Sequence, residues 1–174
     1  MTELDEAPLD REAPPIEVRG LISRIGDRTI HDHLDLVVNR GDVVGVVGAS
    51  GTGKSVLLNT IIGLRNAEGG SVMIFGQDIR YARRPQWTAI NRRWGVLFQQ
   101  GALWSNLTVK ENVAAPLFEH TDMLKDEIDE LADLKIALAG LPPGAGALKP
   151  SELSGGMIKR ASLARALALD PELL

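Results

Sequence analysis

A glycine-rich segment at residues 48–55 constrains this chain more than any other feature. Its residues run Gly-Ala-Ser-Gly-Thr-Gly-Lys-Ser, and they stand between a nearly continuous apolar run, 42–48, and a segment with apolar residues at helical spacing, 54–64. Such an apolar run is typical of a parallel β-strand that is covered on both faces. The order of strand, glycine-rich loop and helix therefore predicts an α/β core whose loop N–H groups turn inward and bind an anion.

The spacing within this loop fits G-x-x-x-x-G-K-[ST], a pattern that binds nucleotide phosphates. We expect Lys54 to reach the β- and γ-phosphates and the Ser55 hydroxyl to coordinate Mg²⁺. The expected nucleotide-binding residues are Gly48, Ala49, Ser50, Gly51, Thr52, Gly53, Lys54 and Ser55. A flexible turn before a core helix is the plainer interpretation, but strand, spacing, lysine and hydroxyl together disfavour it. The loop alone does not choose among ATPases, GTPases and small-molecule kinases.

Composition narrows the class of protein around the loop. The chain has 174 residues, is 44% hydrophobic and carries a net charge of -4, which is typical of one globular domain. Because the 19 Lys and Arg residues are outnumbered by 23 Asp and Glu residues, we expect no nucleic-acid partner. The absence of cysteine excludes disulfides and thiolate metal sites. Every apolar run is far shorter than the ~20 residues of a spanning helix, so any membrane association is expected to be peripheral.

The first part of the chain predicts a tail followed by strands. Residues 1–15 hold acidic side chains and prolines with almost nothing to bury, and we expect them to be disordered. From Ile16 onward apolar and polar residues roughly alternate, with a turn signal at Gly26-Asp27, which predicts a small antiparallel layer. Further strands are expected at 71–76 and 94–99. We assign residues 16–100 to a binding core and this antiparallel layer.

Three helices are expected in a helical subdomain at 101–168. The first opens with a capping box of Thr108 and Glu111, in which each side chain satisfies the backbone N–H of the other residue. The second carries its apolar residues on one stripe, and the third follows a Ser-Gly-Gly cap. The expected bounds are 108–118, 124–138 and 154–169.

The Ser-Gly-Gly cap belongs to a longer pattern. Residues 153–157, Leu-Ser-Gly-Gly-Met, followed by a basic helix, resemble the signature of ABC-transporter ATP-binding subunits, with Met where the family usually has Gln. Chemically the segment is a helix N-terminus whose free N–H groups face outward to receive an anion. A well-capped structural helix is the alternative, but downstream of a phosphate-binding loop the resemblance is specific.

The resemblance implies two further nucleotide contacts. Gln99, at the end of Leu97-Phe98-Gln99, matches the glutamine of the family's Q-loop, which contacts Mg²⁺ and senses the γ-phosphate; we prefer it to Gln100. Lys54 and Gln99 are the expected catalytic residues. Ile25 stands where members often stack the adenine on an aromatic ring, so we expect apolar and weaker base recognition.

The resemblance covers about Ile16 to Leu174 and implies a fold and an assembly. The fold is α/β: a P-loop NTPase core of parallel sheet flanked by helices, with an N-terminal antiparallel β layer and an inserted helical subdomain. The assembly is a head-to-tail homodimer around two ATPs. In it, Ser154, Gly155 and Gly156 contact the ATP of the partner subunit.

Residues 97–121 and 152–174 look most like the ATPases of bacterial Mla/MCE-type lipid transporters. This implies an integral-membrane permease, an MCE-type lipid-binding protein in the same complex, and phospholipid or another hydrophobic cargo. It also implies a cytoplasmic location, peripheral on the inner membrane of a bacterium. Leu103, Trp104, Leu107 and Phe118 would then lie near the permease, although for any one of them the subdomain core is the simpler interpretation.

The end of the chain departs from the family. There the signature helix leads into an apolar strand ending in an aspartate and a catalytic glutamate, then a switch histidine, whereas this chain reaches Leu174 where that strand would begin. Asp170 and Glu172 precede that strand and are not substitutes. We therefore expect a C-terminally incomplete domain with little or no ATP turnover. A non-hydrolysing regulator that dimerises on ATP is the alternative function, and a P-loop kinase is disfavoured by the signature.

Two side-chain groups remain. His31 and His33 share a strand face, but no third metal ligand is evident, so we expect them to be surface or core residues. Arg83, Arg84, Arg92 and Arg93 are expected to form a solvated face, with contact to anionic lipid or a partner as the alternative.

Overall fold

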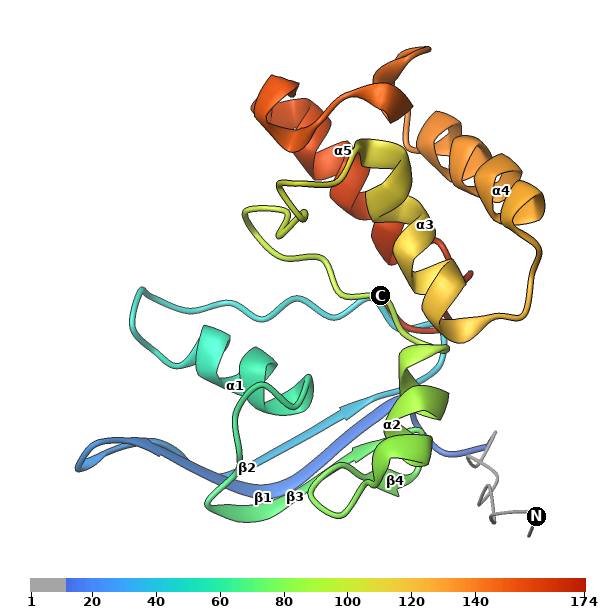
Figure 1. Ribbon diagram of the computed structural model, residues 1–174. Coiled ribbons are helices and arrows are strands. Elements are labelled where there is room, and N and C mark those ends of the chain that lie inside the picture. The colour runs from blue at the N-terminus through green and yellow to red at the C-terminus, as the bar shows by residue number, and fades with distance from the viewer. Residues whose placement is uncertain (1–11) are drawn as a thin grey trace, which may run out of the picture. The chain divides into compact units, whose positions relative to one another are not determined.

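The computed structural model describes residues 12–174, which divide into two compact units (Figure 1). The first ends at Ile90 and the second is Asn91–Leu174. Most of the predicted disordered tail, residues 1–11, lies outside the described residues. Its last residue, Pro15, is buried, and its carbonyl accepts a hydrogen bond of 3.1 Å from the Phe75 N–H. The ordered chain therefore begins before Ile16.

The first unit is built on an antiparallel sheet. Among the described residues the strand order is β2-β1-β3-β4, and each neighbouring pair is antiparallel. The hairpin turn predicted at Gly26-Asp27 is confirmed, because Ile25 pairs with Arg28 across it. The predicted strand at 71–76 is also confirmed. The strands are β1 (Ile16–Ile25), β2 (Arg28–Val38), β3 (Gly69–Ile74) and β4 (Gln77–Asp78).

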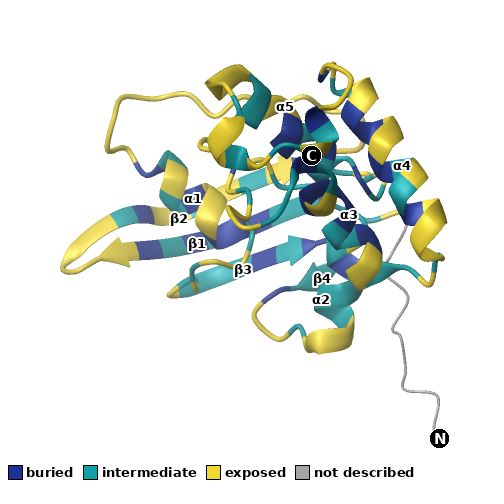
Figure 2. Cartoon of the chain, turned by 45° about the horizontal axis from the view of Figure 1, so that its top comes forward, coloured by how far each residue is buried: buried dark blue, intermediate teal, exposed yellow. Residues whose placement is uncertain are grey.

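One face of this sheet carries the core of the first unit. Val18 and Leu21 of β1 and Val72 of β3 are fully buried, and Figure 2 shows buried positions alternating mostly with partly buried ones along these strands. Helix α1 (Lys54–Ile61) contacts β3 and buries Leu57 and Ile61. The predicted helix after the glycine-rich loop is thus confirmed, and its apolar side is held by the sheet.

Helix α2 (Arg84–Asn91) was not predicted from the sequence. Half of its eight residues are polar, and Ile90 is its buried position. Trp87 explains why the segment is nevertheless ordered, because its indole ring packs directly against Gly63. A Cβ added to Gly63 would lie 2.4 Å from Cη2 of that ring. Trp87 and the buried Ile90 anchor this helix, and two such residues do not make a periodic pattern.

The strands predicted at 42–48 and 94–99 are the main error. Residues 42–49 form no strand in the structure, and Val43 and Val47 are 100% and 91% exposed. In the second segment a single parallel bridge joins Trp94 to Leu173. A parallel strand exists through hydrogen bonds to its neighbours, and no described segment runs beside 43–47 to provide them. Residues 42–48 thus have the apolar composition of a strand, but no other described segment pairs with them.

The second unit is helical. Its main helices are α3 (Val109–His120), α4 (Lys125–Leu138) and α5 (Gly155–Ala166), with short 3-10 turns η1 (Ala145–Ala147) and η2 (Pro150–Glu152). All three predicted helices are confirmed, although α5 ends three residues early. Their shared core comprises Val109, Val113, Ala114, Leu117, Ile128, Ala132, Ile136, Leu141, Ala145, Ala161, Ala164 and Ala168.

The capping box of α3 has the expected geometry. The Glu111 N–H donates to Thr108 Oγ1 at 3.2 Å, and the Thr108 N–H donates to Glu111 Oε2 at 2.7 Å.

Within residues 12–174, none of the helices combines the length and apolar character that crossing a membrane requires.

Candidate nucleotide-binding site

The glycine-rich loop in the first unit has the backbone shape of an anion-binding loop. Gly51 and Gly53 adopt φ angles of 82° and 97°, in the left-handed region that favours glycine. Gly53 is also buried against β2: a Cβ there would lie 2.4 Å from Ile30 Cγ2 and 2.9 Å from His31 Nε2. Strand β2 therefore fixes where the loop passes into α1.

Lys54 lies over this loop. Its ammonium Nζ donates to the carbonyls of Gly48 at 2.7 Å and Ala49 at 2.8 Å, and the Thr52 hydroxyl donates to the same Ala49 carbonyl at 2.9 Å. The positive charge is thus held at the mouth of the loop by the loop itself. An arriving phosphate finds the cation already in place, which lowers the ordering cost of binding.

The N-terminus of α1 adds backbone donors. Gly53 occupies the N-cap, and no side chain of the described residues caps this end. The first backbone bond across the cap runs from the Leu57 N–H to the Gly53 carbonyl at 2.9 Å, so the N–H groups of Lys54, Ser55 and Val56 precede the helical ladder. With the helix dipole, these groups favour an anion.

The donor set fits a nucleotide triphosphate with Mg²⁺. Residues 48–55 contain N–H donors, hydroxyls and one ammonium but no carboxylate, and Ser55 is exposed. Among residues 12–174 no group of three or more His, Asp or Glu side chains is placed to hold a metal. Within the loop, the Ser55 hydroxyl is a neutral oxygen that could add to the phosphate oxygens around a magnesium ion, as Mg²⁺ tolerates.

The second unit presents another open helix N-terminus, that of α5. Ser154 is its N-cap, and the Met157 N–H donates to Ser154 Oγ at 3.3 Å, as predicted. Gly155 and Gly156 are exposed, and a Cβ on either would meet no described atom within 4 Å. Packing in this chain therefore does not require glycine there, although glycine costs a helix about 0.5–1 kcal/mol relative to alanine. The glycines leave this surface open to close approach from outside.

Gln99 and Gln100 both lie exposed in a turn. The structure does not distinguish between them, so the preference for Gln99 stays a prediction. Gly101, which follows, is buried and attached to α5. The first unit thus carries the loop and Lys54, while the second carries Gln99 and the Ser154–Gly156 segment.

The adenine and histidine predictions concern β1 and β2. Ile25, at the end of β1, is 52% exposed and available as an apolar platform.

His33 is exposed and lies 2.7 Å from Asp32, whereas His31 is buried, with Nδ1 2.6 Å from Ser23 Oγ. Burial lowers the pKa of His31 below its usual 6.5. Sequence reasoning did not recognise that this ring supports Gly53, because alternation in a strand indicates burial without naming the neighbour.

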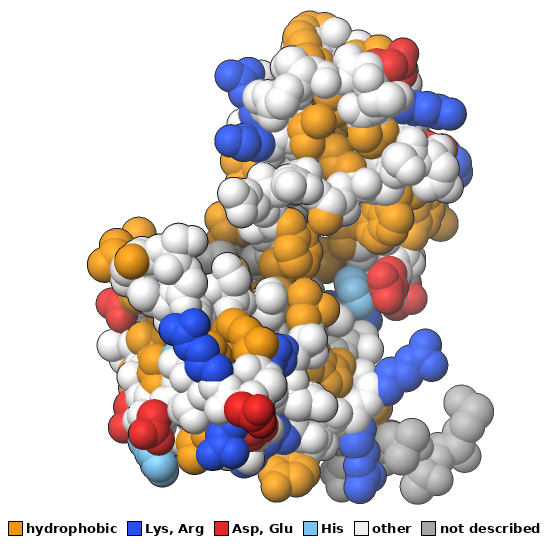
Figure 3. Space-filling view, turned by 90° about the vertical axis from the view of Figure 1, so that its left-hand side faces the viewer, with side chains coloured by type: hydrophobic (Ala, Val, Ile, Leu, Met, Phe, Trp, Pro, Cys, Tyr) orange, Lys and Arg blue, Asp and Glu red, His pale blue; other side chains and the backbone are white. Residues whose placement is uncertain are grey.

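The charged residues near the end of the chain are paired. Arg93 Nε lies 2.6 Å from Glu172 Oε1, and Lys135 Nζ lies 2.5 Å from Asp170 Oδ1. On the face drawn in Figure 3, Lys and Arg side chains are scattered among acidic ones instead of gathering into one patch. Of the four arginines at 83, 84, 92 and 93, Arg93 therefore has a structural role.

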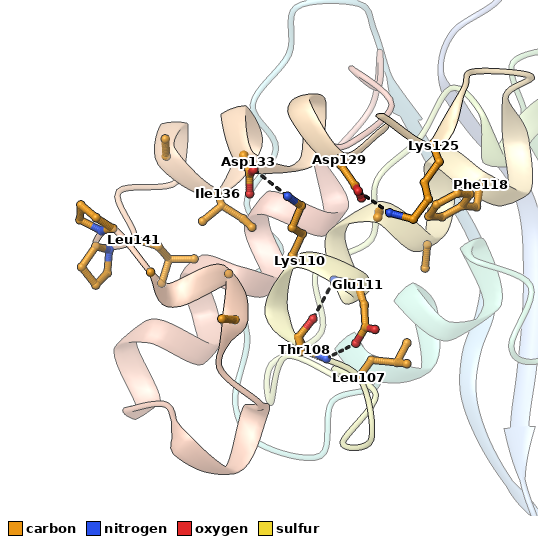
Figure 4. Close-up of a pocket in the computed structure, with 18 of the residues that line it drawn as sticks. Leu107, Thr108, Lys110, Glu111, Phe118, Lys125, Asp129, Asp133, Ile136 and Leu141 are labelled. Atoms are coloured by element: carbon orange, nitrogen blue, oxygen red, sulfur yellow. Dashed lines mark hydrogen bonds and ion pairs between the residues drawn. The ribbon is translucent and has the colours of Figure 1, made fainter. Parts of the chain in front are cut away.

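A groove of about 1330 Å³ runs between α3, α4 and η1 (Figure 4). Its lining includes Leu107 and the 54%-exposed Phe118, two of the residues predicted near the permease. Lys110 crosses to Asp133 at 2.7 Å, an ion pair that ties the two helices together. Leu103 instead packs against the helical core, which bears out the plainer interpretation for that residue.

The antiparallel layer, the glycine-rich loop entering α1 and the capped helical unit define the chain's class as an α/β nucleotide-binding cassette. A family model agrees: the chain belongs to the ABC transporter family, whose model matches residues 31–174. The predicted family and fold class are thereby confirmed.

Similar proteins place the chain within that family. It is 44% identical over 159 residues to the intermembrane phospholipid transport system ATP-binding protein MlaF of Haemophilus influenzae, covering 91% of this chain and 60% of that protein. It is also 44% identical over 160 residues to the probable ribonucleotide transport ATP-binding protein mkl of Mycobacterium tuberculosis, covering 91% of this chain and 44% of that protein. The chain therefore spans less than two thirds of these relatives.

A solved structure shows the same fold. It is a dimeric post-hydrolysis state of an ATP-binding cassette bound to ADP and Pi, with a TM-score of 0.80 and 31% identity, covering 90% of this chain and 70% of that one.

Proposed function

We propose that this chain is the ATP-binding part of an ABC-transporter subunit, and that the whole protein hydrolyses ATP to drive transport. The observation that carries the proposal is the placement of Lys54, whose ammonium is held at the mouth of an uncapped, carboxylate-free loop. A cation and a helix N-terminus at one place are what a triphosphate requires.

In this proposal the loop 48–55 binds the phosphates, Lys54 neutralises the β- and γ-phosphates, and Ser55 and Gln99 hold Mg²⁺. The ion would offset charge on the transferring phosphoryl group. Ile25 would contact the adenine, since it is apolar and half exposed.

The second half of the site comes from another copy of the chain. Ser154, Gly155 and Gly156 would contact ATP on the partner, which accounts for glycines that no contact among residues 12–174 requires. The 31%-identical cassette that was solved as a dimer with ADP and Pi supports this arrangement. ATP then joins two copies, and neither copy alone has a complete site.

The transport system is proposed from the relatives. Similarity to MlaF, a phospholipid transport ATP-binding protein, supports phospholipid or another hydrophobic molecule as the cargo. With such a cargo we propose an integral-membrane permease and an MCE-type protein in the same complex, and a cytoplasmic location on the bacterial inner membrane. The groove in Figure 4, with Leu107 and Phe118 on its lining, is the surface we propose for the permease. The name of mkl offers ribonucleotides as the competing cargo.

A non-hydrolysing regulator that dimerises on ATP remains the alternative. Asp170 and Glu172, the acidic residues that follow α5, both form ion pairs, and we assign neither of them a catalytic role. In this alternative, ATP-driven dimerisation itself is the output.

The test is Mg-ATP binding and turnover by this chain and by the longer product wherever the reading frame continues past Leu174. Lys54→Ala is compared with Lys149→Ala, an exposed lysine outside the loop. Turnover that requires Lys54 supports the transporter ATPase, and binding that requires Lys54 without turnover in either product supports the regulator. Binding unaffected by Lys54→Ala would refute the site. Reconstitution with the permease in vesicles, using labelled phospholipid and labelled ribonucleotide, distinguishes the cargoes.

A further inference from the structure

The loop that follows Gln99 and Gln100 is attached to helix α5 by one arginine. Arg165 Nη1 donates to the Ala102 carbonyl at 2.8 Å, and Nη2 donates to the Gly101 carbonyl at 3.0 Å. Ser162, one turn earlier on α5, donates its hydroxyl to the same Gly101 carbonyl at 3.0 Å. Two consecutive carbonyls of the loop are therefore bound by the helix that begins at Ser154.

The backbone of this loop is held in an unusual conformation. Gly101 and Ala102 have φ angles of 83° and 48°, both in the left-handed region, where a non-glycine residue is uncommon. A Cβ on Gly101 would lie 2.5 Å from Ser162 Oγ and 2.7 Å from Ile158 Cγ2, so the loop backbone touches α5 directly. The hydrogen bonds from Arg165 and Ser162 stabilise this turn against relaxing.

The same guanidinium also fixes the next part of the loop. It lies over the Trp104 ring, 5.0 Å from the centroid. The Trp104 backbone is fixed from the other side by buried Asn112, which accepts from the Trp104 N–H at 2.8 Å and donates to its carbonyl at 3.1 Å. The segment 101–104 is therefore bonded to both α5 and α3.

We propose that Arg165 is a positioning residue that makes the Gln99 loop and the Ser154–Gly156 helix N-terminus respond to nucleotide as one body. This rests on the proposed function, in which Gln99 senses the γ-phosphate and α5 contacts ATP on the partner. A displacement of the turn on γ-phosphate binding would pull on α5 through two parallel hydrogen bonds. Lysine cannot replace this fork, since its ammonium provides one point of attachment and no planar ring contact.

The activity test uses the full protein as purified, with Arg165→Met and Arg165→Lys. The matched control is Arg160→Met, because Arg160 also lies on α5 and donates to a loop carbonyl, that of Gly140 at 2.8 Å, at the end of α4. We expect Arg165→Met to lower kcat about tenfold while the Kd for Mg-ATP stays within about twofold, and to reduce the preference for ATP over ADP. Arg165→Lys is expected to fall between. Equal kcat in Arg165→Met and the parent, or an equal loss in Arg160→Met, overturns the proposal.

Amide hydrogen exchange separates this proposal from the proposed function. In Arg165→Met we expect faster exchange at residues 99–104 with unchanged exchange at 156–164, and Arg160→Met should leave 99–104 as in the parent. If the parent shows no turnover, the proposed function fails, but the exchange pattern still decides whether Arg165 fixes the loop. Unchanged exchange at 99–104 in Arg165→Met would refute its positioning role.

Discussion

Gly53 packs against Ile30 so closely that a Cβ on the glycine would come within 2.4 Å of the isoleucine Cγ2. The contact joins the end of the phosphate-binding loop to the antiparallel layer within the first unit. The φ angle of 97° at Gly53 turns the chain into α1 at that point, directly before Lys54. The position of Ile30 on β2 and the backbone conformation at Gly53 therefore depend on each other.

Gly53→Ala should consequently lower the stability of the first unit. We expect the free energy of unfolding to fall by about 2–4 kcal/mol, from left-handed strain together with steric overlap. Gly41→Ala is the matched control, because Gly41 has a φ of 83° but no described atom within 4 Å of its Cβ position. Urea denaturation should show a loss of only about 1–2 kcal/mol for the control. Equal losses would mean that the Ile30 contact contributes nothing.

Gly155→Ala and Gly156→Ala should weaken ATP-dependent dimerisation without lowering stability. Both positions are in the first turn of α5, without a positive φ and with open space around the Cβ. Alanine there should leave the free energy of unfolding unchanged or raise it by up to about 1 kcal/mol. ATP-dependent dimerisation, measured by light scattering, should weaken because the new methyl groups face the approaching nucleotide. Dimerisation as strong as in the parent would contradict the proposed role of these glycines.

Several of the features that the sequence predicted correctly are set by near neighbours. The Thr108 and Glu111 cap and the turn at Gly26-Asp27 each follow from residues within one turn of each other. The strand at 42–48 failed because a strand depends on a distant partner that the described chain does not provide. Arg165 was missed for a related reason: its acceptor Gly101 is 64 positions away, and no local pattern reports such a contact.

Asn112 is a buried polar residue whose removal should destabilise the helical unit. Its side-chain oxygen accepts from the Trp104 N–H, and its amide nitrogen shares two hydrogens among three carbonyls, those of Trp104, Leu107 and Thr108, at 2.9–3.3 Å. Asn112→Ala leaves these groups without their partner, and we expect a loss of about 2–3 kcal/mol in the free energy of unfolding. Asn106→Ala, at an exposed position of the same loop, should change it by less than about 0.5 kcal/mol. Denaturant titrations of both variants check this, and a similar small effect in each would show that the bonds of Asn112 are not needed.

His31 should make the stability of the first unit depend on pH. Its ring is buried between Ser23 and Gly53, and burial lowers its pKa below 6.5. As pH falls through 6.5 the unfolded chain takes up a proton first, so the free energy of unfolding decreases, and the decrease ends below the folded pKa. His31→Gln should therefore flatten the stability profile between about pH 7 and pH 5.5. Urea denaturation across this pH range decides the matter, and an unchanged slope in His31→Gln would rule out His31 as its source.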